Sequence, residues 1–322
     1  TSAIRPVSPI GASRTSRHDC ATVAPMDARA TFGTVLTAMV TPFHADGSMD
    51  LDSAARLADH LVTAGCDGLV VSGTTGESPT THGPEKADLV RAVVGAVGGR
   101  AKVVAGAGSN DTAHAVRMAE CAAEAGADAL LVVSPYYNRP SQEGVAVHIE
   151  TVASATDLPV MLYDIPGRTG VAIGPEASAR LARHPNVLAV KDATGNAVAG
   201  CRRGHATGLA IYSGDDPLNL SFLTHGAVGV VSVVGHVAAD RYRRMVDAVA
   251  ASDLAGALAV HDELLPLVDA IMGTGQGAVL AKHAVHELGL IGTAHLRLPL
   301  VPPTDGQRTA LLAAMRALGY LG

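Results

Sequence analysis

The residue best suited to covalent chemistry is Lys191, which lies within residues 187–196, VLAVKDATGN. A continuous apolar run followed by turn residues predicts a strand buried on both faces, with Lys191 at its carboxyl end. Parallel α/β folds place their chemistry at that end. A desolvated lysine has a lowered pKa and can form a Schiff base with a carbonyl substrate. The same pattern also fits a lysine that simply reaches solvent.

The scarcity of lysine favours a catalytic role. The chain has 24 basic residues but only four lysines, at 86, 102, 191 and 282. Lys86 falls in a polar helical stretch and Lys282 in a late helix. Lys102 opens a predicted strand, which is the wrong end for chemistry. Lys191 is therefore the lysine that the sequence places for catalysis.

Other polar groups follow neighbouring predicted strands. The loop at residues 73–78, GTTGES, has glycines and hydroxyls that suit a carboxylate, although glycines also make ordinary turns. Tyr163 ends the strand before that of Lys191, so its phenol can move protons beside the amine. Arg168 can bind a carboxylate through two N–H groups. These groups indicate a site for an α-keto acid and a second, carboxylate-bearing partner.

Eight apolar runs alternate with helical patterns and must position these groups. The alternation predicts the α/β class and a (β/α)8 TIM barrel with a C-terminal helical appendage. A doubly wound sheet is the alternative, but its usual GxGxxG turn is missing from the sequence. The predicted strands are 35–40, 68–72, 102–105, 129–133, 160–163, 187–190, 210–212 and 229–233.

Composition changes divide the chain into three parts. Residues 1–32 are rich in Ser, Thr, Ala, Arg and Pro without periodicity, which predicts a disordered N-terminal extension. Residues 33–250 form the predicted barrel, and residues 251–322 the C-terminal helical region. Within the barrel, Gly200 and Gly204 predict that the helix at residues 197–207 is short or irregular.

Charge and cysteine usage restrict the partners. The net charge is −6 and the sequence has no basic run, which disfavours nucleic acid and anionic membranes. No apolar run approaches 18 residues. Four scattered cysteines without a CxxC pair favour reduced thiols and a cytoplasmic protein. His283 and His286 share a helix face but lack a third ligand nearby, so no metal site is predicted.

From about Gly33 to its C-terminus, the chain resembles the dihydrodipicolinate synthase family of class I pyruvate-dependent aldolases. The matching segments are residues 73–77, 135–140, 163–170, 190–196 and 213–216. The resemblance implies a lyase that condenses pyruvate with L-aspartate 4-semialdehyde, in the route to diaminopimelate and lysine. It also implies that no metal or organic cofactor is needed, because the imine serves as the electron sink.

The resemblance assigns catalytic roles to four residues. Lys191 is similar to the Schiff-base lysine, and Tyr163 to the tyrosine that transfers protons during imine and enamine chemistry. Thr75 and Tyr137 are similar to the other members of a proton relay with Tyr163. In the family, the tyrosine at the position of Tyr137 reaches into the neighbouring subunit's site. A homodimer unit is therefore implied, and a homotetramer is common in the family.

The resemblance also assigns substrate-binding roles. Thr74, Thr75 and the backbone of Val231 would hold the pyruvate carboxylate, and Gly214 would lie near the pyruvate. Arg168 would bind the carboxylate of the semialdehyde. Two other functions stay open: a sister aldolase acting on a 2-keto-3-deoxy sugar acid or N-acetylneuraminate, and a catalytically silent barrel that binds a keto acid.

One departure concerns regulation by lysine, which inhibits many family members at a dimer-interface site. Lys86 and His114 replace residues that pair with the lysine ligand, so we expect weak or absent inhibition. The corresponding positions in this sequence are Ser78, Pro79, Gly83, Lys86, Asn110, His114 and Tyr136.

Overall fold

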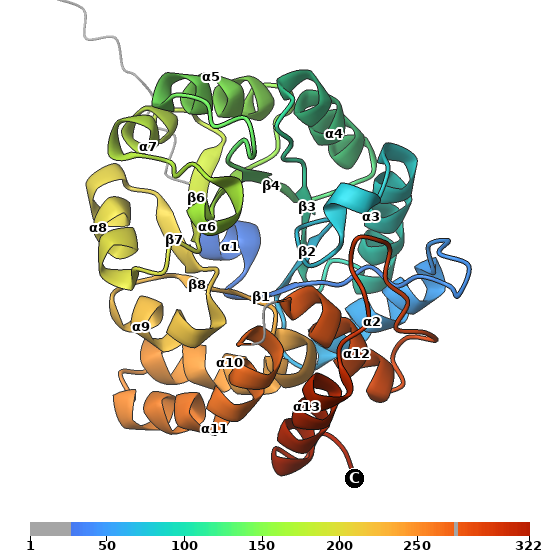
Figure 1. Cartoon of the computed structure of the whole chain (residues 1–322). Coiled ribbons are helices and arrows are strands. Elements are labelled where there is room, and N and C mark those ends of the chain that lie inside the picture. The colour runs from blue at the N-terminus through green and yellow to red at the C-terminus, as the bar shows by residue number, and fades with distance from the viewer. Residues whose placement is uncertain (1–26, 274–275) are drawn as a thin grey trace, which may run out of the picture.

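The computed structural model describes residues 27–273 and 276–322 and contains a closed barrel of eight parallel strands (Figure 1). Each strand pairs with its sequence neighbours, and β8 closes the barrel against β1. The predicted (β/α)8 fold is therefore confirmed. The strands are β1 (Val35–Ala38), β2 (Gly68–Val71), β3 (Lys102–Gly106), β4 (Ala129–Val133), β5 (Val160–Asp164), β6 (Val187–Asp192), β7 (Ala210–Ser213) and β8 (Gly229–Ser232).

The strands are short and almost wholly buried, because both of their faces are covered. Side chains that point inward fill the barrel with one apolar cluster, which includes Leu36, Val104 and Met161. Side chains that point outward join a larger cluster beneath the surrounding helices. This double burial explains why the strands appear in the sequence as continuous apolar runs rather than alternating ones.

Helices surround the barrel as an outer ring (Figure 1). Several begin at a side chain that accepts a backbone N–H, such as Asp50, Asp111 and Asn196. The ring helices are α2 (Leu51–Thr63), α3 (Gly83–Val97), α4 (Thr112–Glu124), α5 (Gln142–Ala153), α7 (Pro175–Leu181), α8 (Ala197–Thr207), α9 (Asn219–Thr224) and α10 (Gly235–Ala250).

The expectation of a short or irregular helix at residues 197–207 is wrong. α8 is a continuous helix of 11 residues. Its glycines serve close packing instead. A Cβ at Gly200 would lie 2.5 Å from a carboxylate oxygen of Asp192, and one at Gly204 would lie 2.6 Å from Ile211. The two glycines therefore let α8 lie directly against β6 and β7.

Residues 1–32 were predicted to be a disordered extension. Residues 1–26 lie outside the described residues, and the prediction is wrong for residues 28–32. Helix α1 (Ala28–Phe32) lies at the amino-terminal end of the barrel, with Phe32 completely buried. The Tyr212 hydroxyl shares its one proton between the carbonyl oxygens of Ala28 and Gly33, which lie at 3.0 and 2.8 Å. The rings of Phe32 and Tyr212 meet edge to face at 6.1 Å. α1 therefore plugs the end of the barrel that is opposite the predicted chemistry.

Three further helices follow the barrel: α11 (Leu254–Met272), α12 (Gly277–Glu287) and α13 (Asp305–Ala317). α10 packs against both β1 and α11, so the division at residue 250 stays a prediction. Among the described residues, no single helix is long and apolar enough to cross a membrane, and α11 and α12 meet that test only as a bent pair.

Candidate active site

The two residues predicted to carry the chemistry lie side by side at the carboxyl ends of β5 and β6. Tyr163 pairs in register with Lys191. Side chains alternate along a strand, and Met161 and Ala189, two residues earlier, belong to the barrel interior. Tyr163 and Lys191 therefore point inward as well. The Lys191 amine lies 4.3 Å from the centroid of the Tyr163 ring.

The Lys191 side chain is buried without a hydrogen-bonded counter-ion. Lys191 is 5% exposed, and none of the salt bridges within residues 27–273 and 276–322 involves its amine. Burial lowers the pKa of Lys191 to about 8, with the Asp216 carboxylate opposing this shift and Arg168 adding to it. About a tenth of the amine is therefore neutral at pH 7 and about half at pH 8, and the neutral amine is the nucleophile.

Gly214 gives the lysine its space. A Cβ at this position would lie 2.8 Å from Cγ and 2.9 Å from Cε of Lys191. The Gly214 N–H also donates to the Asp192 carbonyl at 2.7 Å, which fixes the backbone beside the lysine. Gly214 was predicted to lie near the substrate, and the structure places it against the lysine side chain itself.

Tyr163 is held in its protonated form. Burial raises the pKa of Tyr163 to about 12, while Arg168 and a hydrogen bond with the Thr74 hydroxyl lower it and Asp215 raises it further. Thr74 lines the cleft above the barrel, whereas Thr75 is buried and is not among its lining residues. The geometry therefore favours Thr74 over Thr75 as the hydroxyl partner of Tyr163.

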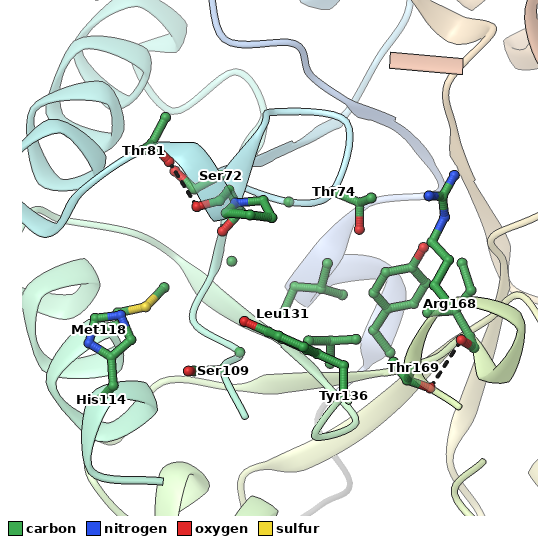
Figure 2. A pocket seen from close by; sticks show the side chains of 18 of the residues that line it. Ser72, Thr74, Thr81, Ser109, His114, Met118, Leu131, Tyr136, Arg168 and Thr169 are labelled. Carbon is green, nitrogen blue, oxygen red and sulfur yellow. Dashed lines mark hydrogen bonds between the residues drawn. The ribbon is translucent and has the colours of Figure 1, made fainter. Parts of the chain in front are cut away.

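A cleft of about 610 Å³ opens beside Tyr163 and Thr74, which both line it, whereas Lys191 is not among its lining residues. Figure 2 shows Thr74 and Arg168 at one end and His114 and Met118 at the other. Arg168 comes from the short helix α6 (Pro166–Thr169), which directly follows β5. The described residues that line the cleft include arginine, lysine and histidine but no aspartate or glutamate. Such a lining attracts anionic ligands.

Comparison with known proteins agrees with this arrangement. Residues 31–318 match the Dihydrodipicolinate synthetase family. The chain belongs to this family. A curated relative from Mycolicibacterium paratuberculosis, named 4-hydroxy-tetrahydrodipicolinate synthase, is 53% identical over 295 residues, covering 92% of this chain and 98% of the relative. A relative of the same name from Acidothermus cellulolyticus is 54% identical over 291 residues, covering 90% and 94%.

A solved structure of similar fold comes from Cyanidioschyzon merolae and is described as dihydrodipicolinate synthase with lysine bound. It has a TM-score of 0.87 and 41% identity, covering 90% of this chain and 99% of its own. The likeness extends over the barrel and the helices that follow it, so this chain has the overall architecture of the family.

Tyr137 and Val231 were also predicted to belong to the site. Tyr137 borders the cleft, but it is 89% exposed and has a left-handed backbone with φ of 72°. Val231 lies on β8, 1% exposed, with its side chain in the barrel interior.

The far end of the cleft contains the positions expected for a lysine ligand. Ser78, Pro79, Gly83, Lys86, His114 and Tyr136 line it, whereas Asn110 does not. The Lys86 amine donates to the Ser78 carbonyl at 2.7 Å and to the Thr81 carbonyl at 2.8 Å. Burial lowers the pKa of Lys86 to about 8. Lys86 was predicted in a polar stretch, but this amine is buried and satisfied by backbone oxygens.

An ion-pair network that was not predicted from the sequence lies beneath the loop that carries Thr74 and Thr75. Lys282 and Glu77 are completely buried and form a salt bridge. The second Glu77 oxygen accepts the Arg297 N–H at 3.0 Å. Glu77 has a left-handed backbone with φ of 55° and ends the loop that carries Thr74. The C-terminal region therefore holds the loop at the barrel mouth from behind. In the sequence, this network is indicated by Lys282, a lysine within a mostly apolar helical stretch.

Metal ligation finds no support in the described part of the chain. No group of three or more His, Cys, Asp or Glu side chains is placed there to hold an ion. His283, considered from the sequence, makes a hydrogen bond with the Val279 carbonyl of its own helix through Nδ1.

Proposed function

We propose that this chain is a 4-hydroxy-tetrahydrodipicolinate synthase in which Lys191 condenses pyruvate with L-aspartate 4-semialdehyde. The observation that carries the proposal is the Lys191 amine, which makes no ion pair among the described residues and lies beside Tyr163. Tyr163 in turn lines a cleft in which the described residues provide no carboxylate. The names of relatives that are 53% and 54% identical over most of the chain support the same reaction.

The neutral Lys191 amine attacks the keto carbon of pyruvate, and loss of water gives an imine. Loss of a methyl proton then gives an enamine, which forms the new carbon–carbon bond at the aldehyde of the semialdehyde. The amino group of the second substrate attacks the imine carbon, closes the ring and releases Lys191. Tyr163, with its pKa raised to about 12, is a proton donor through these steps. The enzyme needs no metal or organic cofactor in this sequence of steps.

Two groups at the mouth bind the carboxylates in this proposal. The backbone and hydroxyls of the loop carrying Thr74 and Thr75 receive the pyruvate carboxylate, with the Val231 backbone opposite. Arg168, at the same end of the cleft as Thr74, receives the carboxylate of the semialdehyde (Figure 2). With Thr74 hydrogen-bonded to Tyr163, the proposed relay consists of Tyr163, Thr74 and the neighbouring subunit's copy of Tyr137, and Thr74 takes the place assigned to Thr75.

The proposal includes a homodimer, in which Tyr137 completes the site of the neighbouring subunit. Its 89% exposure in the single chain supports this arrangement. A solved relative of 35% identity and TM-score 0.86 is described as a monomeric dihydrodipicolinate synthase variant, so assembly requires its own measurement. The free thiols of Cys66, Cys121 and Cys201 support a reducing, cytoplasmic setting.

The deciding experiment measures pyruvate-dependent consumption of the semialdehyde and, on the same sample, the mass added by pyruvate and borohydride. We expect turnover together with one adduct per chain on Lys191. An adduct without turnover would contradict the proposed second substrate and favour a sister aldolase or a silent keto-acid-binding barrel. Absence of both would refute the Schiff-base chemistry.

A further inference from the structure

Two buried carboxylates lie directly behind the reactive pair. Asp164 follows Tyr163, Asp192 follows Lys191, and the two aspartates are themselves in register on β5 and β6. Because side chains alternate along strands, the aspartates face the helices while Tyr163 and Lys191 face the barrel interior. Asp164 is 1% exposed and Asp192 is fully buried. Two adjacent buried carboxylates repel each other unless a cation lies between them.

Arg203 on α8 supplies that cation. Its Nη1 donates to Asp164 Oδ2 at 2.5 Å, and its Nη2 donates to Asp192 Oδ2. The remaining oxygens are also occupied: Asp164 Oδ1 accepts the Ile173 N–H at 3.1 Å, and Asp192 Oδ1 accepts the Thr194 N–H at 3.0 Å and its hydroxyl at 2.8 Å. One guanidinium therefore joins the outer faces of both strands at the level of the reactive side chains.

Gly200 makes this contact possible, because any side chain there would collide with the Asp192 carboxylate: even a Cβ would lie 2.5 Å from one of its oxygens. Arg203 lies three residues later on the same helix and is only 13% exposed in its side chain. The close approach of α8 and the buried arginine are parts of one arrangement. It joins two strands whose last inward side chains are Tyr163 and Lys191.

We propose that Arg203 is a positioning residue for the reaction, which fixes the Lys191 amine against the Tyr163 phenol by joining Asp164 to Asp192. Arg203 touches neither substrate in this inference, which rests on the proposed function. A planar guanidinium with two N–H donors to separate carboxylates sets both distance and orientation, which a lysine cannot reproduce. Arg203 also balances two negative charges that would otherwise stabilise the protonated form of the lysine.

The test compares Arg203→Met and Arg203→Lys with a matched control, Arg180→Met. Arg180 also joins two carboxylates, Glu143 and Glu150, but on the surface between α5 and α7. For each variant we would measure kcat, the KM for pyruvate, the folded fraction by circular dichroism, and the pH midpoint of borohydride-trapped imine formation. Asp216 and Arg168, the charged groups that act on Lys191, and Tyr163 are unchanged in all of them.

We expect Arg203→Met to lower kcat roughly tenfold to a hundredfold, because small misplacements of reacting groups have effects of that size. The pH midpoint of imine formation in Arg203→Met should rise by about half a pH unit or more. Without Arg203, the charges of Asp164 and Asp192 favour the protonated form of Lys191. Arg203→Lys should keep the midpoint near that of the unchanged chain yet still lose kcat. Arg180→Met should change neither quantity. If Arg203→Met does not fold, Arg203→Lys alone tests the proposal. A lowered kcat with an unchanged pH midpoint of imine formation would support it.

The inference is overturned if both Arg203 variants match Arg180→Met, or if activity falls only in proportion to the folded fraction with an unchanged midpoint in Arg203→Met. If the proposed function itself is wrong, the unchanged chain will form no borohydride-trapped adduct with pyruvate. The positioning role of Arg203 would then be refuted as well. If the unchanged chain forms the pyruvate adduct but neither Arg203 variant differs from Arg180→Met, only the positioning role of Arg203 is refuted.

Discussion

Two lysines of this chain are buried to nearly the same extent but have opposite surroundings. Lys191 is 5% exposed and makes no salt bridge among the described residues, whereas Lys282 is fully buried against Glu77. Lys282 also donates to the His295 carbonyl at 3.0 Å, and its amine lies 4.2 Å from the Phe43 ring centroid. Burial alone therefore does not make a lysine reactive. The lack of a bound acceptor leaves the Lys191 amine available, while the carboxylate holds Lys282 in a structural role.

The largest expected effect is on covalent chemistry. Lys191→Ala should abolish the pyruvate adduct and lower turnover by at least about a thousandfold, because the nucleophile is removed. Mass spectrometry after borohydride and a turnover assay would check this. Lys282→Met is the matched variant and should keep the adduct. An adduct that survives Lys191→Ala would reverse the roles assigned to the two lysines.

The free energy of unfolding should depend on Lys282 more than on Lys191. Lys282→Met leaves Glu77 as an uncompensated buried charge and should lower the free energy of unfolding by about 3–5 kcal/mol. Lys191→Met should be neutral or stabilising, because it removes a desolvated amine that has no ion-pair partner among the described residues. Urea unfolding of both variants measures the difference. Adding Glu77→Gln to Lys282→Met should recover much of the loss, and failure to do so would contradict the ion-pair explanation.

Arg168 tests whether binding can be separated from the reactivity of Lys191. Arg168→Ala should raise the KM for the semialdehyde roughly tenfold to a hundredfold, as expected for loss of a charged hydrogen-bonding partner. Imine formation with pyruvate should be spared. Steady-state kinetics and trapping would be measured beside Arg139→Ala, which removes another arginine of the same cleft. Loss of imine formation in Arg168→Ala would instead place Arg168 at the pyruvate.

The pH dependence should report Lys191 and not Lys282. Burial lowers the pKa of Lys191 to about 8, and only the neutral amine attacks. The rate of imine formation should therefore rise with pH and level off above the pKa, with a gain of roughly tenfold from pH 7 to 9. Rapid trapping across that range measures it. A rate that is flat in pH would mean that the amine is already neutral at pH 7.

The smallest effect concerns the third buried lysine, Lys86. Free L-lysine at low millimolar concentration should slow turnover by less than about twofold, because the described residues that line the cleft offer no carboxylate to its ammonium groups. His114→Glu supplies a carboxylate there and should create or strengthen inhibition. Dose–response curves of both proteins decide this, and full inhibition of the unchanged chain would show that Lys86 and His114 do not exclude the ligand.

Lys191 and the eight strands could be predicted because their signals are local. A buried parallel strand is a continuous apolar run, and a lysine at its end departs visibly from that run. The partners of Lys282 and Arg203 carry no such signal. Glu77 is 205 residues from Lys282 in the sequence, and Arg203 is 39 from Asp164. Which of Thr74 and Thr75 turns toward Tyr163 depends on the loop backbone, and the role of Gly200 depends on the strand beneath it.

The plug made by α1 has a kinetic consequence. Phe32 is completely buried, and the Tyr212 hydroxyl binds the backbone carbonyls of Ala28 and Gly33. Helix α1 therefore closes the barrel below Lys191. In the proposed reaction, both reactants and the product must use the same opening. Pyruvate attached to Lys191 would lie above the closed end, and the semialdehyde would reach it from the carboxyl ends of the strands. Because the imine must form before the carbon–carbon bond in that reaction, we expect pyruvate to bind before the semialdehyde and both to enter from the open end of the barrel.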